Sequence, residues 1–224
     1  MVSSSRTAGS GPEQRIVMSR NTLFLASLAA FVATAIPAPA SPSPSETRAL
    51  YLLNCLEFVE WPTAAFADSQ SPVVIGVIGK DPFGAELDKL QQKTVNGRKL
   101  QIKRFKGALE FRGEETPGRR QDSLSLKQAR KISELKTCHI LFISASEENY
   151  IPLILKPLRS CSVLTMSDSN GFAREGGVIR FLDEGNRVRL EINLDAADRA
   201  GLKISSKLLS LAKVVKNGRP ADGK

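Results

Sequence analysis

The segment from Pro72 to Gly79 most constrains the fold, because it is a short, continuous apolar run. It reads Pro-Val-Val-Ile-Gly-Val-Ile-Gly and is rich in β-branched residues. Such a run is typical of a parallel strand that is covered on both faces. Two further apolar runs, over 139–144 and 162–167, follow it with helix-like stretches between them. Strands that alternate with helices predict an α/β protein with a mostly parallel sheet.

Stop and start signals place the elements around these strands. A helix is predicted over 46–60, where most residues are apolar, and Pro62 ends it. A second helix is predicted from Asp81 to about Leu90, with Asp81 as its N-cap and Pro82 in its first turn. Further elements are expected as follows: a turn at Asn96-Gly97, a strand over Leu100–Phe105, and helices over 126–135 and 147–158.

The C-terminal part changes character. Residues 178–183 and 187–194 flank Glu184-Gly185-Asn186, which predicts a β-hairpin. The second strand alternates, with one apolar face made by Val188, Leu190, Ile192 and Leu194. A final helix is predicted from an apolar stripe of Ile204, Leu208, Leu211 and Val215. We therefore expect a sheet flanked by helices, with an antiparallel C-terminal hairpin at its edge.

The N-terminus has the three parts of a secretory signal peptide. Arg15 and Arg20 precede an apolar run from Leu23 to Ile36, which ends in Ala38-Pro39-Ala40. The run is shorter than the roughly 20 residues that a membrane span needs, although an uncleaved anchor is the alternative. No Cys follows the run closely, which disfavours a lipoprotein. We therefore expect a cleaved signal and an exported protein.

These signals divide the chain into five parts. Met18-Ser19-Arg20 would itself make a compact signal start, so residues 1–17 are interpreted as a start-site artefact or a dispensable extension. The expected parts are a signal peptide over 1–40, a Ser/Pro-rich linker over 41–45, a single domain over 46–216 with a flexible insertion at 106–127, and a disordered tail over 217–224.

The chain is basic, with 32 Lys and Arg against 23 Asp and Glu and a formal net charge of +9. An exported chain meets no chromosome, and its aromatic residues do not alternate with its basic ones. Nucleic acid is therefore not expected as a partner. The surplus favours peripheral contact with an anionic membrane surface or an acidic partner. A merely solvated basic surface is the alternative.

Two of the three cysteines stand in matching contexts. Cys138 and Cys161 each begin a run that passes through an apolar core and ends in Ser, at Ser144 and Ser167. If the runs are neighbouring parallel strands, the two cysteines lie side by side at one sheet edge. The strand spacing of about 4.8 Å then falls inside the Cα window of a disulfide. A Cys138–Cys161 disulfide is predicted, with Cys55 as a buried free thiol.

Candidate catalytic and metal-binding groups are few. His139 is the single histidine and lies inside an apolar strand, which favours a core residue over a metal ligand. The sequence shows neither a nucleophile-elbow motif nor a phosphate loop of the Gly-Lys type. We expect no catalytic residues, no metal site and no cofactor.

One loop is a candidate contact for a ligand or partner. It leaves the C-terminal end of a parallel strand, where α/β proteins bind ligands. Its candidate contact residues are Asp168, Gly171, Phe172, Gly176 and Gly177. An ordinary turn before the hairpin is the alternative.

Several motifs occur in a distinctive order. They are Phe58-Val59-Glu60-Trp61-Pro62, the strand Val74–Gly79, Cys138–Ile143, Val163–Asp168 with Gly171-Phe172, Gly176-Gly177, Glu191–Leu194 and Leu208–Ala212. Over residues 46–215, this ordered set resembles the YfiR/HmsC-like family of bacterial periplasmic proteins.

The resemblance implies a regulator without enzymatic activity. Such a protein binds the periplasmic sensory part of an inner-membrane diguanylate cyclase and holds it inactive, which lowers cyclic di-GMP and biofilm formation. Relatives often dimerise, so a homodimer is also implied. The redox state of a disulfide tunes some relatives, and here Cys138 and Cys161 would have to serve. A periplasmic small-ligand binding module for a sensor or transporter is the alternative function.

Overall fold

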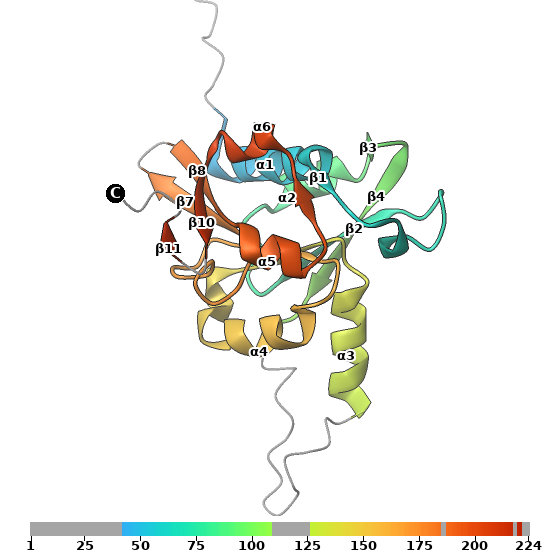
Figure 1. The fold of residues 1–224 in the computed structure, drawn as a ribbon. Helices are drawn as coiled ribbons and strands as arrows, with labels where there is room; N and C mark the ends of the chain where they lie inside the picture. Colours follow the sequence, from blue (N-terminus) through green and yellow to red (C-terminus); the bar gives the residue numbers. More distant parts are fainter. Residues whose placement is uncertain (1–41, 109–125, 185–186, 217–218, 221–224) are drawn as a thin grey trace, which may run out of the picture. The chain divides into compact units, whose positions relative to one another are not determined.

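The protein is built on one large, mostly parallel sheet. The computed structural model describes residues 42–108, 126–184, 187–216 and 219–220. These form a nine-stranded sheet in the order β11-β10-β8-β7-β6-β5-β2-β4-β3 (Figure 1). Strand β2, Val73–Ile78, pairs in parallel with β4, Arg98–Phe105, and with β5, Ile140–Ile143. Strand β6, Leu164–Ser167, continues the parallel part beside β5. The α/β fold class predicted from the apolar runs is confirmed.

The remaining elements are short. The helices are α1 Pro44–Phe58, α2 Ala85–Leu90, α3 Leu126–Lys136, α4 Ile151–Leu155, α5 Leu194–Arg199 and α6 Ser206–Leu209. The 3₁₀ turns are η1 Thr63–Ala65, η3 Ala145–Tyr150 and η4 Lys156–Leu158. The other strands are β1 Val59–Glu60, β3 Thr94–Val95, β7 Ile179–Glu184, β8 Arg187–Asn193, β9 Lys203–Ile204, β10 Ala212–Lys216 and β11 Arg219–Pro220. Within the described part of the chain, no helix is long and apolar enough to cross a membrane.

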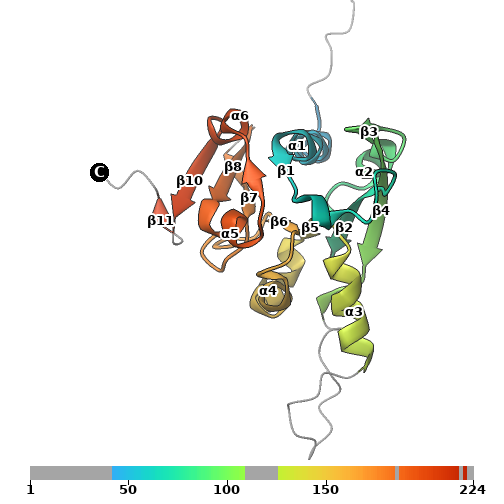
Figure 2. The ribbon, with the colours of Figure 1, turned by 45° about the vertical axis from the view of Figure 1, so that its right-hand side comes forward.

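Helices cover both faces of the sheet. Helices α1 and α2 lie on one face, and α3 and α4 lie on the other (Figures 1 and 2). Alternate residues of β2 serve these two layers: Val73, Ile75 and Val77 join the α1 core cluster, whereas Val74 and Ile78 join the α4 cluster. Every residue of β2 is buried, which explains why its sequence is apolar without alternation.

Helix α1 begins and ends earlier than the sequence predicts. Ser43 is its N-cap, with Oγ accepting from the Glu46 N–H at 3.2 Å, and Pro44 occupies the first turn. Pro44 and Ser45, assigned to the linker, are therefore helical. The helix ends at Phe58 because Val59 and the next residue form β1, which pairs with β9.

The predicted start of α2 is wrong. Asp81 does not cap the helix, because its Oδ1 accepts from the backbone N–H groups of Phe83 (2.7 Å) and Gly84 (3.1 Å) and closes a separate turn. The helix begins after Gly84, whose φ is 55°. The turn at Asn96-Gly97 is confirmed: both residues have positive φ, 51° and 76°, and connect β3 to β4.

The predicted C-terminal helix is also wrong. The structure has the short α6 and then β10, which pairs in parallel with β8. The hairpin of β7 and β8 is confirmed, but β10 and β11 lie outside it in the sheet. Strand β11 takes two residues from the expected tail. The predicted signal peptide, residues 109–125 of the predicted insertion and residues 185–186 of the predicted hairpin turn lie outside the described residues.

Candidate functional site

A hollow of about 420 Å³ lies beside the C-terminal end of α1. A volume of this size falls in the range of about 300–1,000 Å³ that small-molecule pockets occupy. The floor is apolar and the rim carries aromatic and charged groups. The lining residues come from α1, β1, the following turn, β2 and the β3–β4 turn: Leu56, Glu57, Val59, Glu60, Trp61, Phe66, Val73, Val95, Asn96 and Arg98. We call this region the α1 hollow.

Aromatic stacking and hydrogen bonds hold one wall of the α1 hollow. The Trp61 Nε1–H donates to the backbone oxygen of His139 at 3.2 Å. The Phe66 ring stacks on the His139 ring, with centroids 4.4 Å apart. On Phe66, the guanidinium carbon of Arg98 lies 4.0 Å from the ring centroid. Arg98 Nη1 also donates to the backbone oxygens of Asp68 (2.9 Å) and Ser71 (2.8 Å). Arg98 therefore braces the turn that follows Phe66.

His139 is a structural brace behind this wall. Its side chain is buried, and its Nδ1 accepts from the Val74 N–H at 3.0 Å. Its Nε2 lies 3.1 Å from the Ala65 oxygen, so the proton belongs on Nε2 in a neutral ring. Burial lowers the pKa of His139, and nearby Arg98 lowers it further, against the bond to Ala65, which raises it. The interpretation of His139 as a core residue is confirmed.

Two carboxylates stand at the rim. Glu57 lies in the last turn of α1 and Glu60 in β1, and both side chains are exposed. Among the residues that the structure describes, neither carboxylate has an ion-pair or hydrogen-bond partner. The same residues contain no group of three or more His, Cys, Asp or Glu placed to hold a metal. The charges at the rim are therefore free to meet a partner.

Contacts with neighbouring elements and with the core fix the conformation of the candidate loop 168–177. Asp168 Oδ1 accepts from the Ala145 N–H at 2.8 Å, and Phe172 is fully buried in the α4 core cluster. Gly171 and Gly176 have φ of 79° and 100°. A Cβ on Gly177 would come within 3.0 Å of the Phe172 ring. The five predicted residues thus lie in one loop, and their contact with a ligand or partner stays a prediction.

The crevice at the topological switch point is filled by the chain itself. The strand order reverses between β5 and β2, and α/β proteins bind ligands outside the carboxyl ends of such strands. Here Oε2 of the buried Glu147 accepts from the Ala108 N–H at 2.6 Å, and Ser146 Oγ accepts from the Lys80 N–H at 3.0 Å. A Cβ on Gly107 would lie 2.8 Å from Glu147 Oε1. The buried Glu147 side chain and its contacts therefore occupy this crevice.

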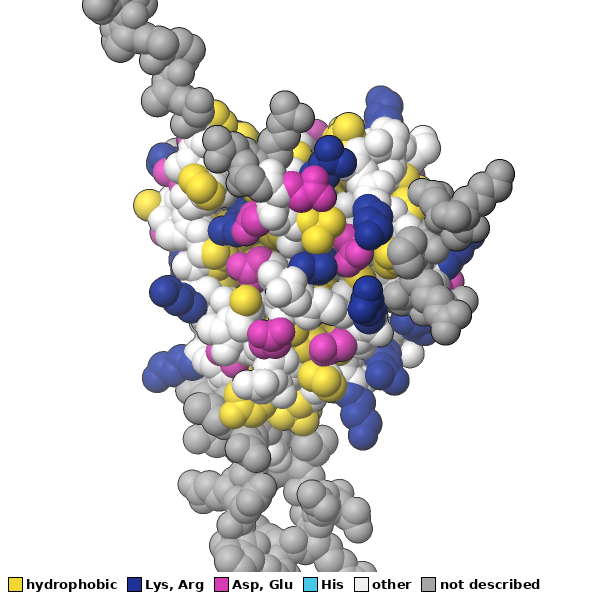
Figure 3. Space-filling model, turned by 90° about the vertical axis from the view of Figure 1, so that its left-hand side faces the viewer, with side chains coloured by type: hydrophobic (Ala, Val, Ile, Leu, Met, Phe, Trp, Pro, Cys, Tyr) yellow, Lys and Arg dark blue, Asp and Glu magenta, His cyan; other side chains and the backbone are white. Residues whose placement is uncertain are grey.

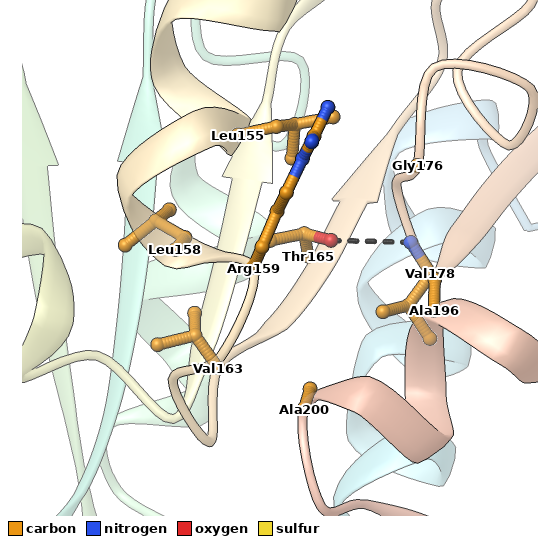
Figure 4. A pocket seen from close by; sticks show the side chains of 9 residues that line it. All are labelled: Leu155, Leu158, Arg159, Val163, Thr165, Gly176, Val178, Ala196 and Ala200. Atoms are coloured by element: carbon orange, nitrogen blue, oxygen red, sulfur yellow. Dashed lines mark hydrogen bonds between the residues drawn. The ribbon is translucent and has the colours of Figure 1, made fainter.

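A second hollow, between β6 and α5, is too small for a ligand. Figure 4 shows its lining, where Thr165 Oγ1 accepts from the Val178 N–H at 3.1 Å. Its volume is about 10 Å³, which is roughly the room that one water molecule needs. The α1 hollow is therefore the better candidate site.

The cysteines form a different arrangement from the one expected. Ile140 pairs with Leu164, one residue off the alignment that set the two cysteines side by side. Cys138 Sγ lies 3.9 Å from the Glu134 oxygen and Cys161 Sγ 3.6 Å from the Pro157 oxygen, and all three cysteines are free thiols in the structure. Burial raises the pKa of both Cys55 and Cys138 to about 12. Cys138 and Cys161 border the same core cluster, so their disulfide stays a prediction.

Mass spectrometry after alkylation tests this pairing. We expect denatured, non-reduced protein from an oxidising compartment to take up one alkyl group, on the buried Cys55. After reduction it should take up three. A Cys161→Ser variant is the control, because it leaves Cys138 without a partner and should take up two groups without reduction. Uptake of three groups by the non-reduced wild type would end the disulfide proposal.

Sequence patterns missed the α1 hollow. Trp61 appeared as the residue before Pro62, and neither Phe66 nor Arg98 was identified as a site residue. The available signal was the single tryptophan of the chain, placed just beyond a helix and followed closely by a second aromatic residue.

Comparison with known proteins places these features in a family context. The family model described as YfiR/HmsC-like matches residues 45–213. The comparison with curated proteins found no match. Among solved structures, a conserved domain protein from Vibrio cholerae O1 biovar eltor aligns with a TM-score of 0.48 and 13% identity. The alignment covers 77% of this chain and 60% of that protein.

Proposed function

Because the chain belongs to the YfiR/HmsC-like family, we propose that it binds the periplasmic sensory domain of an inner-membrane diguanylate cyclase and holds that enzyme inactive. Members of this family are periplasmic regulators of diguanylate cyclases. In this proposal, residues 1–40 act as a cleaved signal peptide. Loss of the protein then raises cyclic di-GMP and promotes biofilm formation.

The α1 hollow is the observation that carries the proposal. Trp61 is half-buried at its mouth, between an apolar floor and a polar rim. Tryptophan and arginine are enriched among the residues that dominate binding energy at protein interfaces, where they fill pockets on the partner. The arrangement therefore supports docking of a protein surface at the end of α1.

The chemistry of the buried groups supports binding without turnover. Both ring nitrogens of His139 are engaged inside the fold. Burial raises the pKa of the Cys55 thiol to about 12, so it stays protonated and is a weak nucleophile at neutral pH. These groups serve the fold, and we propose a non-enzymatic regulator.

Two further contacts belong to the proposal. Arg174 and Glu175 are the exposed charged members of the loop 168–177 and offer a second contact to the partner. On the face drawn in Figure 3, Lys and Arg side chains are interspersed with Asp and Glu. Cleavage of residues 1–40 removes three Arg and one Glu, and the remaining net charge of +7 suits diffuse attraction to an anionic membrane surface, in addition to specific contact with the cyclase.

Replacing Trp61 by alanine tests the docking surface. We expect binding of the cyclase's periplasmic domain to weaken by about tenfold or more, because a buried aromatic anchor is lost. Leu153→Ala is the matched control, since Leu153 is 45% exposed on α4, on the opposite face of the sheet. The measurement is affinity of the purified proteins, with thermal unfolding to check that each variant is folded.

The same variants extend the test to the native host. Deleting the gene should raise the cyclic di-GMP level. Expression of the wild type or Leu153→Ala should lower it again to the original level, whereas expression of Trp61→Ala should not. Unchanged cyclic di-GMP after deletion, together with failure to recover a cyclase from the periplasm, would contradict the proposed function.

A small-ligand binding module is the second candidate, and the volume of the α1 hollow favours it. Thermal-shift screening separates the two functions. A small molecule that raises the unfolding temperature strongly, in a protein that captures no cyclase, would favour the ligand module.

A further inference from the structure

We propose that the α1 hollow receives an arginine or lysine side chain of the partner, with its charge between Glu57 and Glu60. This inference rests on the proposed function, because the basic side chain comes from the cyclase's periplasmic domain. It names the chemistry that the partner must present at this site.

The rim of the α1 hollow carries negative charge that the fold does not compensate. Glu57 and Glu60 are exposed, and neither has a partner in the described part of the chain. Glu57 also lies in the last turn of α1, which holds no basic residue. The negative end of the helix dipole disfavours a carboxylate there and favours a cation. A positive group from the partner would neutralise the two carboxylates and interact favourably with the negative end of the helix dipole.

The aromatic wall suits a cation as well. Arg98 already lies over Phe66, which shows that a guanidinium packs against this wall. Its Nη1 bonds to two backbone oxygens, and it forms no ion pair with either rim glutamate. Trp61 offers a second aromatic surface beside the two carboxylates, and indole is the best ring for cation–π contact.

The apolar floor selects for a long side chain. Leu56, Val59 and Val73 lie beneath the charged rim, and all three are buried. Arginine and lysine lay their methylene stems along such surfaces while the charged head stays at the wet rim. Arg98 lines the same hollow, but its guanidinium is engaged by two backbone oxygens and by the Phe66 ring. Glu57 and Glu60 would repel an acidic side chain.

Short peptides test this chemistry directly on the folded protein. The probes are acetyl-Gly-Arg-Gly-amide and its citrulline counterpart, which has nearly the same shape without the charge. The readout is the indole N–H resonance of Trp61, the single tryptophan of the chain. We expect a saturable shift with the arginine peptide and binding of the citrulline peptide that is weaker by about tenfold. Equal binding of the two peptides would overturn the inference.

Neutral variants of the rim provide the matched test. Glu57→Gln combined with Glu60→Gln should remove the preference for arginine, whereas Glu148→Gln, at an exposed carboxylate on η3, should keep it. If the double variant captures the cyclase domain as tightly as the wild type does, this inference fails and the proposed function stands. If the arginine peptide binds but no cyclase is captured, the proposed function fails instead.

Discussion

Gly177→Ala will lower the free energy of unfolding by about 3 kcal/mol, at the upper end of what overpacking in a core costs. The added Cβ would come within 3.0 Å of three atoms of the Phe172 ring, a distance that real Cβ atoms essentially never show. Phe172 is fully buried in the α4 core cluster, so its ring has no open space to move into. Chemical denaturation followed by the fluorescence of Trp61 measures this loss.

Two companion variants separate the clash from a general effect of losing glycine. Gly97→Ala adds a methyl group where nothing lies within 4 Å, so it reports the strain of a positive φ alone, about 1 kcal/mol. Phe172→Leu in the Gly177→Ala background removes the ring edge, and the double variant should lose less than the sum of the single losses. If Gly177→Ala costs no more than Gly97→Ala, the packing argument is wrong.

The sheet was predictable where burial alone decides the pattern. Strand β2 is covered by helices on both faces, so every position is apolar and the run is recognisable without its neighbours. The prediction of a C-terminal helix failed because pairing with another strand, and not the local pattern, decides the structure there. Leu208, Leu211 and Val215 are spaced like a helix stripe, but β8 offers an unpaired edge and β10 takes it. Pairing with a distant strand overrode the local period.

For the candidate site, too, the sequence predicts some features and misses those that depend on long-range contacts. The position of the loop 168–177 after β6 was correctly derived from the strand order, yet Phe172 points into the core, which position alone does not predict. The α1 hollow needs Trp61 and Arg98 from separate elements, joined through Phe66 and the ring of His139. These contacts form only when the sheet brings separate elements together, so no local spacing in the sequence predicts them.

Acidification will destabilise the protein through His139, which links β2 to the turn that carries Phe66. In the fold, Nδ1 must be unprotonated to accept from the Val74 N–H. Protonation would set two donors face to face and place a cation beside Arg98, the charged group that acts on this ring. Burial is the largest cause that lowers the pKa of His139 below its ordinary value of 6.5, and the charge of Arg98 acts in the same direction.

The sign of the effect follows from linkage. A histidine whose pKa is lowered by folding binds more protons in the unfolded chain, so its contribution to stability is complete above the unfolded value of 6.5. That contribution is lost as the pH falls from there toward the folded pKa. The expected result is an unfolding free energy that declines as the pH falls below 6.5. Carboxylates contribute to the same decline at its acidic end. The contribution of His139 to the free energy of unfolding must therefore be measured against a reference protein.

His139→Asn provides that reference, because its Oδ1 can still accept from the Val74 N–H but does not titrate. At neutral pH we expect the variant to be less stable by about 1–3 kcal/mol, since the bond to Ala65 and the stacking on Phe66 are lost. The carboxylates are common to both proteins, so the difference in unfolding free energy isolates His139. That difference should narrow as the pH falls below 6.5. Parallel curves for the two proteins would mean that His139 does not couple folding to pH, and the brace behind the α1 hollow would then be insensitive to acid.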